Sequence, residues 1–181
     1  MAPKTTTTER RTRDPISPRL ATANDLSEIV RIYNTSIADR MATADLVPVS
    51  VADRSPWFHA HEPTRRPIWV VDGALPKTLS AWLSFSDFYG RAAYDATCEL
   101  SIYVDPSSQR QGFARGLLHA AVEAAPGFGI TTLLGFIFDH NEPSLALFRS
   151  FGFEPWGHLP RIAQLDDHER GVVIVGRRLA P

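Results

Sequence analysis

The chain has 181 residues, 44% of them hydrophobic, and a formal net charge of -1 at pH 7. These values predict one domain with a sizeable core, and they give no electrostatic basis for binding nucleic acid or an anionic membrane. The single cysteine, Cys98, excludes an intramolecular disulfide and fits a reducing, cytoplasmic compartment. No apolar run approaches the ~20 residues that span a bilayer, and no metal-ligand spacing is present, so no metal is expected.

The N-terminal segment Met1 to Arg13 is rich in threonine and contains no leucine, isoleucine, valine or phenylalanine. A secretory signal needs an apolar segment, which is missing here. We therefore expect residues 1–15 to form a disordered tail and residues 16–181 to form a single domain.

A short strand from Ser17 to Thr22 and an amphipathic helix are predicted next. Thr22 and Asp25 resemble a capping box, and apolar residues recur at helical spacing from Leu26 to Ile37. The following strands are predicted from Ile68 to Val71 and from Leu79 to Phe88, which are rich in β-branched and aromatic residues.

Between these elements, Val47 to His61 predicts a loop and a second helix. Pro56 should limit this helix to short regular pieces, because proline lacks the backbone N–H. Trp57 and Phe58 have two open interpretations, as core residues or as a cover over a ligand site.

The stretch from Thr97 to Ala125 predicts a strand, a tight loop and a helix. Side chains from Thr97 to Val104 alternate between the two faces of a strand, and Pro106 ends it. A buried helical stripe then follows. Its residues are Ala114, Leu117, Leu118, Ala121, Val122 and Ala125.

The loop from Gln109 to Ala114 carries the chemical signal. Gly112 leaves its backbone uncovered, so free N–H groups gather at a helix N-terminus, where the helix dipole is also positive. This arrangement binds a phosphate or pyrophosphate. Arg110 and Arg115 add positive charge nearby.

The C-terminal part predicts two strands around a helix and then a further strand. Ile130 to Phe138 is a buried strand, parallel to its predecessor across the intervening helix. The last helix runs from Asn141 to Ser150. Phe153 to Leu159 and Gly171 to Arg178 are expected to pair antiparallel across a loop from Pro160 to Arg170.

The central loop resembles a known cofactor motif. Gln109, Gly112 and Ala114 match the acetyl-CoA-binding motif of the GNAT N-acetyltransferases. In this motif an arginine or glutamine is followed three residues later by a glycine, and two residues after that by a glycine or alanine. The segment from Tyr94 to Phe153 also resembles the phosphinothricin and methionine-sulfoximine acetyltransferase branch. The similarity extends from about Leu20 to Leu179.

The resemblance implies an α/β (α+β) chain with the GNAT acyl-CoA N-acyltransferase fold. Its central sheet would be mixed and mostly antiparallel, with about six or seven strands that splay apart between the fourth and the fifth. About four helices would flank the sheet. The same branch implies a homodimer.

The resemblance also implies how acetyl-CoA would be held. The loop would take the pyrophosphate, and the strand backbone would hydrogen-bond the pantetheine arm. Asn141 and Ser144 match family positions that contact the cofactor, with helix capping as the open alternative. The implied cofactor-binding residues are Ile102, Tyr103, Val104, Gln109, Arg110, Gln111, Gly112, Phe113, Ala114, Asn141 and Ser144.

Glu99 is the predicted general base. A carboxylate is disfavoured on a strand, and Glu99 matches the glutamate that the resembling family uses. It would accept the proton of an ammonium group, with a pKa raised by partial burial. The alternatives are an exposed strand residue or an ion pair with Arg91.

Asn34, Arg91 and Tyr94 are implied to bind the acceptor. Asn34 lies at a helix end that lines the acceptor pocket in the family, and a frayed helix end is the alternative. Arg91 would bind an acceptor carboxylate, and a solvated surface arginine is the alternative.

The chain departs from the family at the leaving-group acid. Phe148 aligns with a tyrosine or a histidine, and a phenyl ring has no proton to give. Either water, His140 or Tyr94 would then protonate the thiolate, or the activity would be altered. The loop from Pro160 to Arg170 also lacks the tryptophan-containing segment expected there.

The predicted function is transfer of the acetyl group of acetyl-CoA to the amino group of a small acceptor. This acceptor is an amino acid or an analogue such as phosphinothricin or methionine sulfoximine, and it attacks directly without a covalent enzyme intermediate. The alternatives are a non-catalytic acyl-CoA-binding protein and a protein or peptide N-acetyltransferase.

Overall fold

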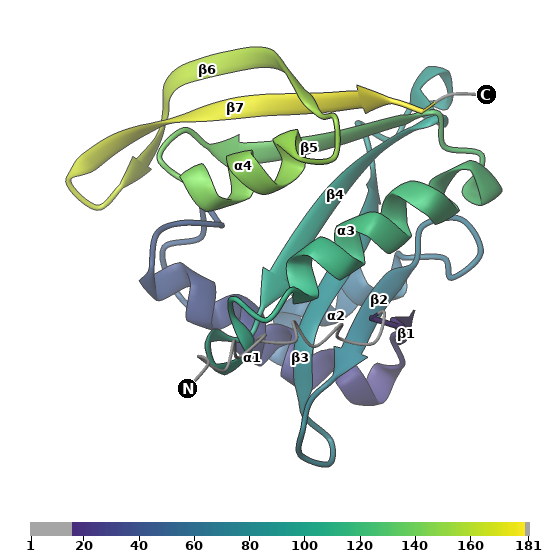
Figure 1. Ribbon diagram of the computed structural model, residues 1–181. Helices are drawn as coiled ribbons and strands as arrows, with labels where there is room; N and C mark the ends of the chain where they lie inside the picture. The colour runs from purple at the N-terminus through teal and green to yellow at the C-terminus, as the bar shows by residue number, and fades with distance from the viewer. Residues whose placement is uncertain (1–15, 180–181) are drawn as a thin grey trace, which may run out of the picture.

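A computed structural model describes residues 16–179 of the chain, so the predicted N-terminal tail lies outside the described residues. The fold is a seven-stranded sheet with helices on both faces (Figure 1). The helices and strands are β1 (Arg19–Leu20), α1 (Leu26–Ala38), α2 (Val51–His59), β2 (Ile68–Asp72), β3 (Leu79–Asp87), β4 (Thr97–Val104), α3 (Phe113–Ala124), β5 (Thr132–Phe138), α4 (Glu142–Arg149), β6 (Glu154–Leu165) and β7 (His168–Arg178).

The strand order β1-β2-β3-β4-β5-β7-β6 confirms the predicted mixed, mostly antiparallel sheet. Only β4 and β5 run parallel, and α3 forms the crossover between them. Their pairing begins at Thr97 and Thr132 and ends at Glu99 and Leu134. Beyond that pair the two strands splay apart, as predicted (Figure 1), and no strand of residues 16–179 pairs with their facing backbone edges.

Two hydrophobic clusters hold the helices on opposite faces of the sheet. The predicted stripe is buried against β3, β4 and β5 from Leu117 to Ala125, whereas Ala114 is half-buried. Helix α4 adds Leu145 and Phe148 to the same cluster. The other cluster joins α1 to β2 and β3 around the fully buried Trp82. Trp57 and Phe58 are half-buried and pack against this second cluster, which supports their interpretation as core residues.

The prediction that Pro56 breaks the second helix is wrong. The helix α2 runs without interruption from Val51 to His59 with Pro56 inside it. Proline removes one backbone hydrogen bond, but the capping box of Ser50 and Asp53 satisfies the first turn. The flanking turns therefore keep the helix intact.

The predicted loop from Pro160 to Arg170 is also wrong. The strands β6 and β7 form a long hairpin that stays paired to Leu165 and His168. Two register shifts in β6 interrupt the alternation of inward- and outward-facing residues, so the sequence shows no regular strand pattern there. Pro160 is tolerated because β6 is the edge strand of the sheet and needs few of its N–H groups.

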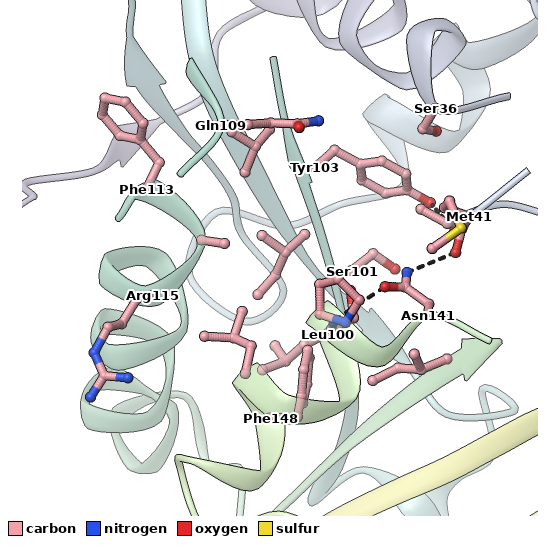
Figure 2. Close-up of a pocket in the computed structure, with 18 of the residues that line it drawn as sticks. Ser36, Met41, Leu100, Ser101, Tyr103, Gln109, Phe113, Arg115, Asn141 and Phe148 are labelled. Atoms are coloured by element: carbon pink, nitrogen blue, oxygen red, sulfur yellow. Dashed lines mark hydrogen bonds between the residues drawn. The ribbon is translucent and has the colours of Figure 1, made fainter. Parts of the chain in front are cut away.

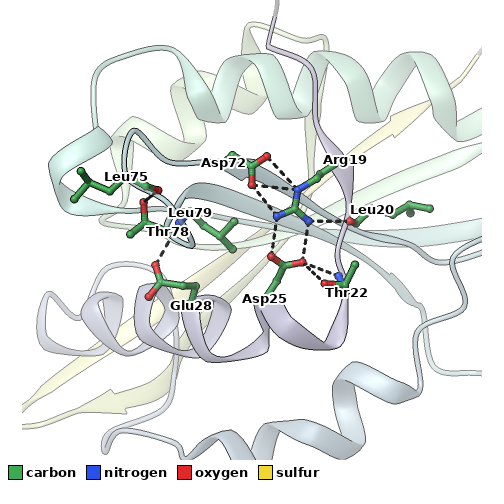
Figure 3. A network of polar contacts seen from close by, with 9 residues as sticks. All are labelled: Arg19, Leu20, Thr22, Asp25, Glu28, Asp72, Leu75, Thr78 and Leu79. Atoms are coloured by element: carbon green, nitrogen blue, oxygen red, sulfur yellow. Dashed lines mark hydrogen bonds and ion pairs between the residues drawn. The ribbon is translucent and has the colours of Figure 1, made fainter.

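A polar network fixes the first strand to the start of α1 (Figure 3). The guanidinium of Arg19 lies 2.8 Å from Asp25 and 2.7 Å from Asp72. Asp25 also accepts a hydrogen bond from the backbone N–H of Thr22 at 2.7 Å, which confirms half of the predicted capping box. The hydrogen bonds from Arg19 lower the pKa of the Asp25 carboxyl to about 2.

The variant Asp25→Asn should lose about 1–2 kcal/mol of unfolding free energy at pH 7, since the carboxylate is buried but its partner Arg19 is 41% exposed to solvent. A depressed carboxyl pKa stabilises the fold above the ordinary value of 3.8, and this contribution disappears as the pH falls toward 2. Urea unfolding at pH 7 and pH 2.5 measures both effects. The matched control is Asp167→Asn, because Asp167 is exposed. A destabilisation of Asp25→Asn that is equal at both pH values would contradict the electrostatic account.

No helix among residues 16–179 is long and apolar enough to cross a membrane. Within the same residues, no group of three or more histidine, cysteine, aspartate or glutamate side chains is placed to hold a metal ion.

Candidate active site

A cavity of about 800 Å³ opens where β4 and β5 splay apart (Figure 2). Its walls are the second half of β4, the end of β5, the loop before α3, the start of α4 and the chain after α1. Cavities of this volume hold small molecules and cofactors.

The structure brings ten of the eleven predicted cofactor-binding residues to this cavity. They are Ile102, Tyr103, Val104, Gln109, Arg110, Gly112, Phe113, Ala114, Asn141 and Ser144. The remaining residue, Gln111, does not line the cavity, and its side-chain amide donates a hydrogen bond to the carbonyl of Ser107 at 3.1 Å. Gln111 therefore stabilises the conformation of the loop through this hydrogen bond. The binding roles of all eleven residues stay predictions.

Gly112 gives the loop its shape at the N-terminus of α3. Its φ of +89° is left-handed, which glycine adopts without strain. A Cβ placed there would meet no atom within 4 Å, so open space lies over this backbone. No side chain of residues 16–179 caps α3, and its first N–H groups are therefore available to an anion. This uncapped, uncovered helix end fits a pyrophosphate.

Asn141 lies where α4 meets the chain after α1. Its side-chain oxygen accepts a hydrogen bond from the backbone N–H of Ser144 at 3.1 Å, so helix capping is present. Its amide nitrogen donates to the carbonyl of Met41 at 2.7 Å (Figure 2). One side chain therefore caps α4 and fixes a cavity wall that is 100 residues away in sequence.

Glu99 occupies the last β4 position that pairs with β5. Glu99 is not one of the residues that line the cavity, but it lies beside Leu100 and on the same face of β4 as Ser101, both of which do. Its carboxylate forms no hydrogen bond or ion pair with residues 16–179, Arg91 included. Burial raises its pKa above the ordinary value of 4.5. A half-buried carboxylate without a partner is suited to accept a proton.

The three predicted acceptor-binding residues lie outside the cavity lining. The side-chain amide of Asn34 forms two hydrogen bonds with the backbone of Val49, at 2.9 and 3.0 Å, so it clamps the chain before α2 to α1. Arg91 is exposed and has no partner among the described residues. Tyr94 is 42% exposed and packs against Phe88. Their binding roles stay predictions.

The cavity wall offers few groups that could protonate a leaving thiolate. Phe148 lines the cavity and packs edge-on against Phe153. Tyr103 also lines it, but burial raises its pKa and its hydroxyl donates to the carbonyl of Ala42 at 3.3 Å. His140 does not line the cavity, and its Nε2 lies 2.9 Å from the carbonyl oxygen of Arg40.

The sequence interpretation did not identify Arg54, a cation that has no carboxylate partner in residues 16–179. The guanidinium of Arg54 lies 4.5 Å from the ring centre of Tyr33 and 4.3 Å from that of Trp57. Its Nε is buried without a hydrogen-bond partner, and no carboxylate lies within 4 Å of Arg54 in residues 16–179. The i, i+3 spacing of Arg54 and Trp57 on one helix could have predicted this contact between the guanidinium and the indole ring.

A splayed parallel strand pair beside an uncapped, glycine-led helix N-terminus is the architecture of an acyl-CoA-dependent transferase. The sequence profile of the acetyltransferase (GNAT) family matches residues 30–153, and the chain belongs to this family. It is an acetyl-CoA-dependent N-acetyltransferase of the GNAT type, as the resemblance predicted.

Relatives cover nearly the whole chain. YwnH of Bacillus subtilis, provisionally named a phosphinothricin acetyltransferase, is 45% identical over 162 residues, which are 90% of this chain and 98% of YwnH. An L-methionine sulfoximine/L-methionine sulfone acetyltransferase of Pseudomonas paraeruginosa is 32% identical over 148 residues, or 82% and 86% of the two chains. The crystal structure of a GNAT superfamily phosphinothricin acetyltransferase from Sinorhizobium meliloti with AcCoA matches with a TM-score of 0.85 at 26% identity, covering 92% and 89%.

Proposed function

We propose that this enzyme acetylates the amino group of a small amino acid or analogue, such as methionine sulfoximine or phosphinothricin. The observation that carries the proposal is Glu99, a half-buried carboxylate without a partner in residues 16–179, which lies at the end of the β4–β5 pairing and next to the cavity-lining residue Leu100. The substrate class follows the names of the relatives at 45% and 32% identity.

The splay explains how the chain would hold the pantetheine arm. On one side, the backbone from Leu100 to Val104 pairs with β3. On the other side, no strand of the described residues pairs with it beyond Glu99, so its free N–H and C=O groups are available to an extended ligand. The arm would then lie along Ile102 to Val104 with its pyrophosphate at Gly112, and the acetyl group would lie near Glu99.

In this arrangement Glu99 first accepts a proton from the acceptor ammonium, and the free amine then attacks the thioester carbonyl carbon. The C–S bond breaks, and the second proton that the nitrogen loses is passed to solvent water. Acetyl-CoA supplies the activated acyl group. Water protonates the thiolate, because Phe148 has no proton to give. Cys98 is not a rival nucleophile: it is fully buried on the opposite face of β4, and burial raises its pKa to about 12.

A thiol-release assay with acetyl-CoA tests this function. Methionine sulfoximine and phosphinothricin should release CoA, whereas polyamines, aminoglycosides and peptides should not. Release with peptides alone would favour the peptide N-acetyltransferase. Binding of acetyl-CoA without release for any amine would favour the non-catalytic acyl-CoA-binding protein, which Phe148 in the acid position makes the second candidate.

The acceptor carboxylate needs a cation, and we assign it to Arg91. The variant Arg91→Gln should raise the KM for the acceptor about 10- to 100-fold, the usual effect of losing a charge-assisted hydrogen bond. The KM for acetyl-CoA should not change. Arg54→Gln is the comparison variant, since Arg54 is also unpaired and lies on the same side of the sheet as Glu99. A KM effect in Arg54→Gln alone would transfer the carboxylate site to Arg54.

The proposal includes a homodimer in the cytoplasm, which the resembling branch implies. Large apolar side chains on the edge strand β6 remain exposed, among them Trp156 and Ile162, and such a surface is suited to a subunit contact. Light scattering of the purified protein measures the molar mass, and a value near that of one chain, 20.1 kDa, would contradict the dimer.

A further inference from the structure

Two arginines line the cavity, and they occupy different places. Arg110 belongs to the loop that precedes α3, and Arg115 belongs to the first turn of α3 itself. Asp39 is the only carboxylate among the described lining residues. It follows the end of α1 and belongs to a different wall.

The guanidinium of Arg115 is held in place without being neutralised. Its Nη1 donates a hydrogen bond to the hydroxyl oxygen of Ser150 at 3.2 Å, and its Cζ lies 5.1 Å from the ring centre of Phe151. Ser150 is itself fixed, because its hydroxyl donates to the carbonyl of Leu147 at 2.7 Å. No carboxylate lies within 4 Å of Arg115 in residues 16–179. Figure 2 shows the side chain extending from α3, away from Tyr103 and Met41.

The direction of coenzyme A in the proposed site decides what lies near Arg115. With the thioester near Glu99 and the pyrophosphate at Gly112, the nucleotide must leave the loop on its outer side, between α3 and the end of α4. The ribose 3′-phosphate is the remaining anionic group of coenzyme A. Arg115 follows the pyrophosphate loop directly and offers a cation that is already oriented toward that exit.

We propose that Arg115 binds the 3′-phosphate of coenzyme A and makes the enzyme select coenzyme A over its 3′-dephospho form. The inference rests on the placement of the pyrophosphate at Gly112 in the proposed function. An arginine forms short, paired hydrogen bonds with a phosphate. Ser150 and Phe151 are positioning residues, because a guanidinium that is already held loses less freedom when the ligand arrives.

Calorimetric titration with coenzyme A and with 3′-dephospho-coenzyme A tests the proposal without any acceptor. The wild-type protein should bind coenzyme A about 10- to 100-fold more tightly than the dephospho form. Arg115→Gln should reduce this ratio to about one while leaving the affinity for the dephospho form unchanged. Arg149→Gln is the matched control, since Arg149 is exposed on the last turn of α4, and it should keep the wild-type ratio.

Ser150→Ala should give an intermediate ratio, because it frees the guanidinium without removing it. General loss of stability would weaken both ligands equally and leave the ratio unchanged. Equal wild-type affinity for the two ligands, or an unchanged ratio in Arg115→Gln, would overturn the role of Arg115 and leave the acetyltransferase proposal intact. Binding of neither ligand would overturn both, because the pyrophosphate site would then be misplaced.

Discussion

Glu99→Gln is expected to lower kcat by about 100- to 10,000-fold, the usual contribution of a general base. The amide keeps the shape of the side chain and removes only its ability to take the ammonium proton. The KM for acetyl-CoA should stay close to that of the wild type, since no described contact links Glu99 to the loop at Gly112. Steady-state kinetics with a saturating acceptor gives both constants.

The same substitution should not destabilise the protein. Burial raises the pKa of Glu99, so the native state favours the protonated form, and ionised Glu99 costs stability at pH values above that pKa. Glu99→Gln should therefore melt at the same or a higher temperature than the wild type at pH 7. Below the ordinary carboxyl pKa of 4.5 the two proteins should converge.

The pH dependence of kcat separates this role from a structural one. Activity of the wild type should rise with pH through the raised pKa of Glu99, because only the carboxylate accepts a proton. Glu123→Gln, on the exposed side of α3, is the matched control and should leave both kcat and its pH profile unchanged. A Glu99→Gln enzyme that retains kcat within threefold would remove Glu99 from the mechanism.

The central strand, loop and helix were predictable because local patterns determine them. The alternation along β4 and the helical stripe of α3 each depend on one surface buried in the core. The splay was predictable only through the family resemblance. Nothing in the sequence between Glu99 and Val104 says that pairing with β5 stops after three residue pairs.

The errors in the sequence interpretation also have physical causes. The strand β6 is an exposed edge with two register shifts, so it has neither a buried face nor a regular alternation to detect. The contact of Arg115 with Ser150 joins residues 35 positions apart, and that of Asn141 with Met41 joins residues 100 apart. Such contacts depend on tertiary packing, which local patterns do not encode.

Gly112→Asp is expected to weaken acetyl-CoA binding about 100-fold or more. The left-handed φ of +89° is unfavourable for any residue with a Cβ, and the new side chain would project into open space over the helix N-terminus. Its carboxylate would then repel the pyrophosphate and compete for the same N–H groups. Titration calorimetry with coenzyme A measures the loss directly.

Gly129→Asp separates the charge effect from backbone strain. Gly129 also has a left-handed φ, +73°, with no atom within 4 Å of a Cβ, but it follows the short helix after α3 and does not line the cavity. Both variants should therefore lose about 1–2 kcal/mol of unfolding free energy from strain, and only Gly112→Asp should lose affinity for coenzyme A. Equal affinity in the two variants would mean that the pyrophosphate does not bind at Gly112, because an added carboxylate at the N-terminus of α3 cannot leave a bound pyrophosphate undisturbed.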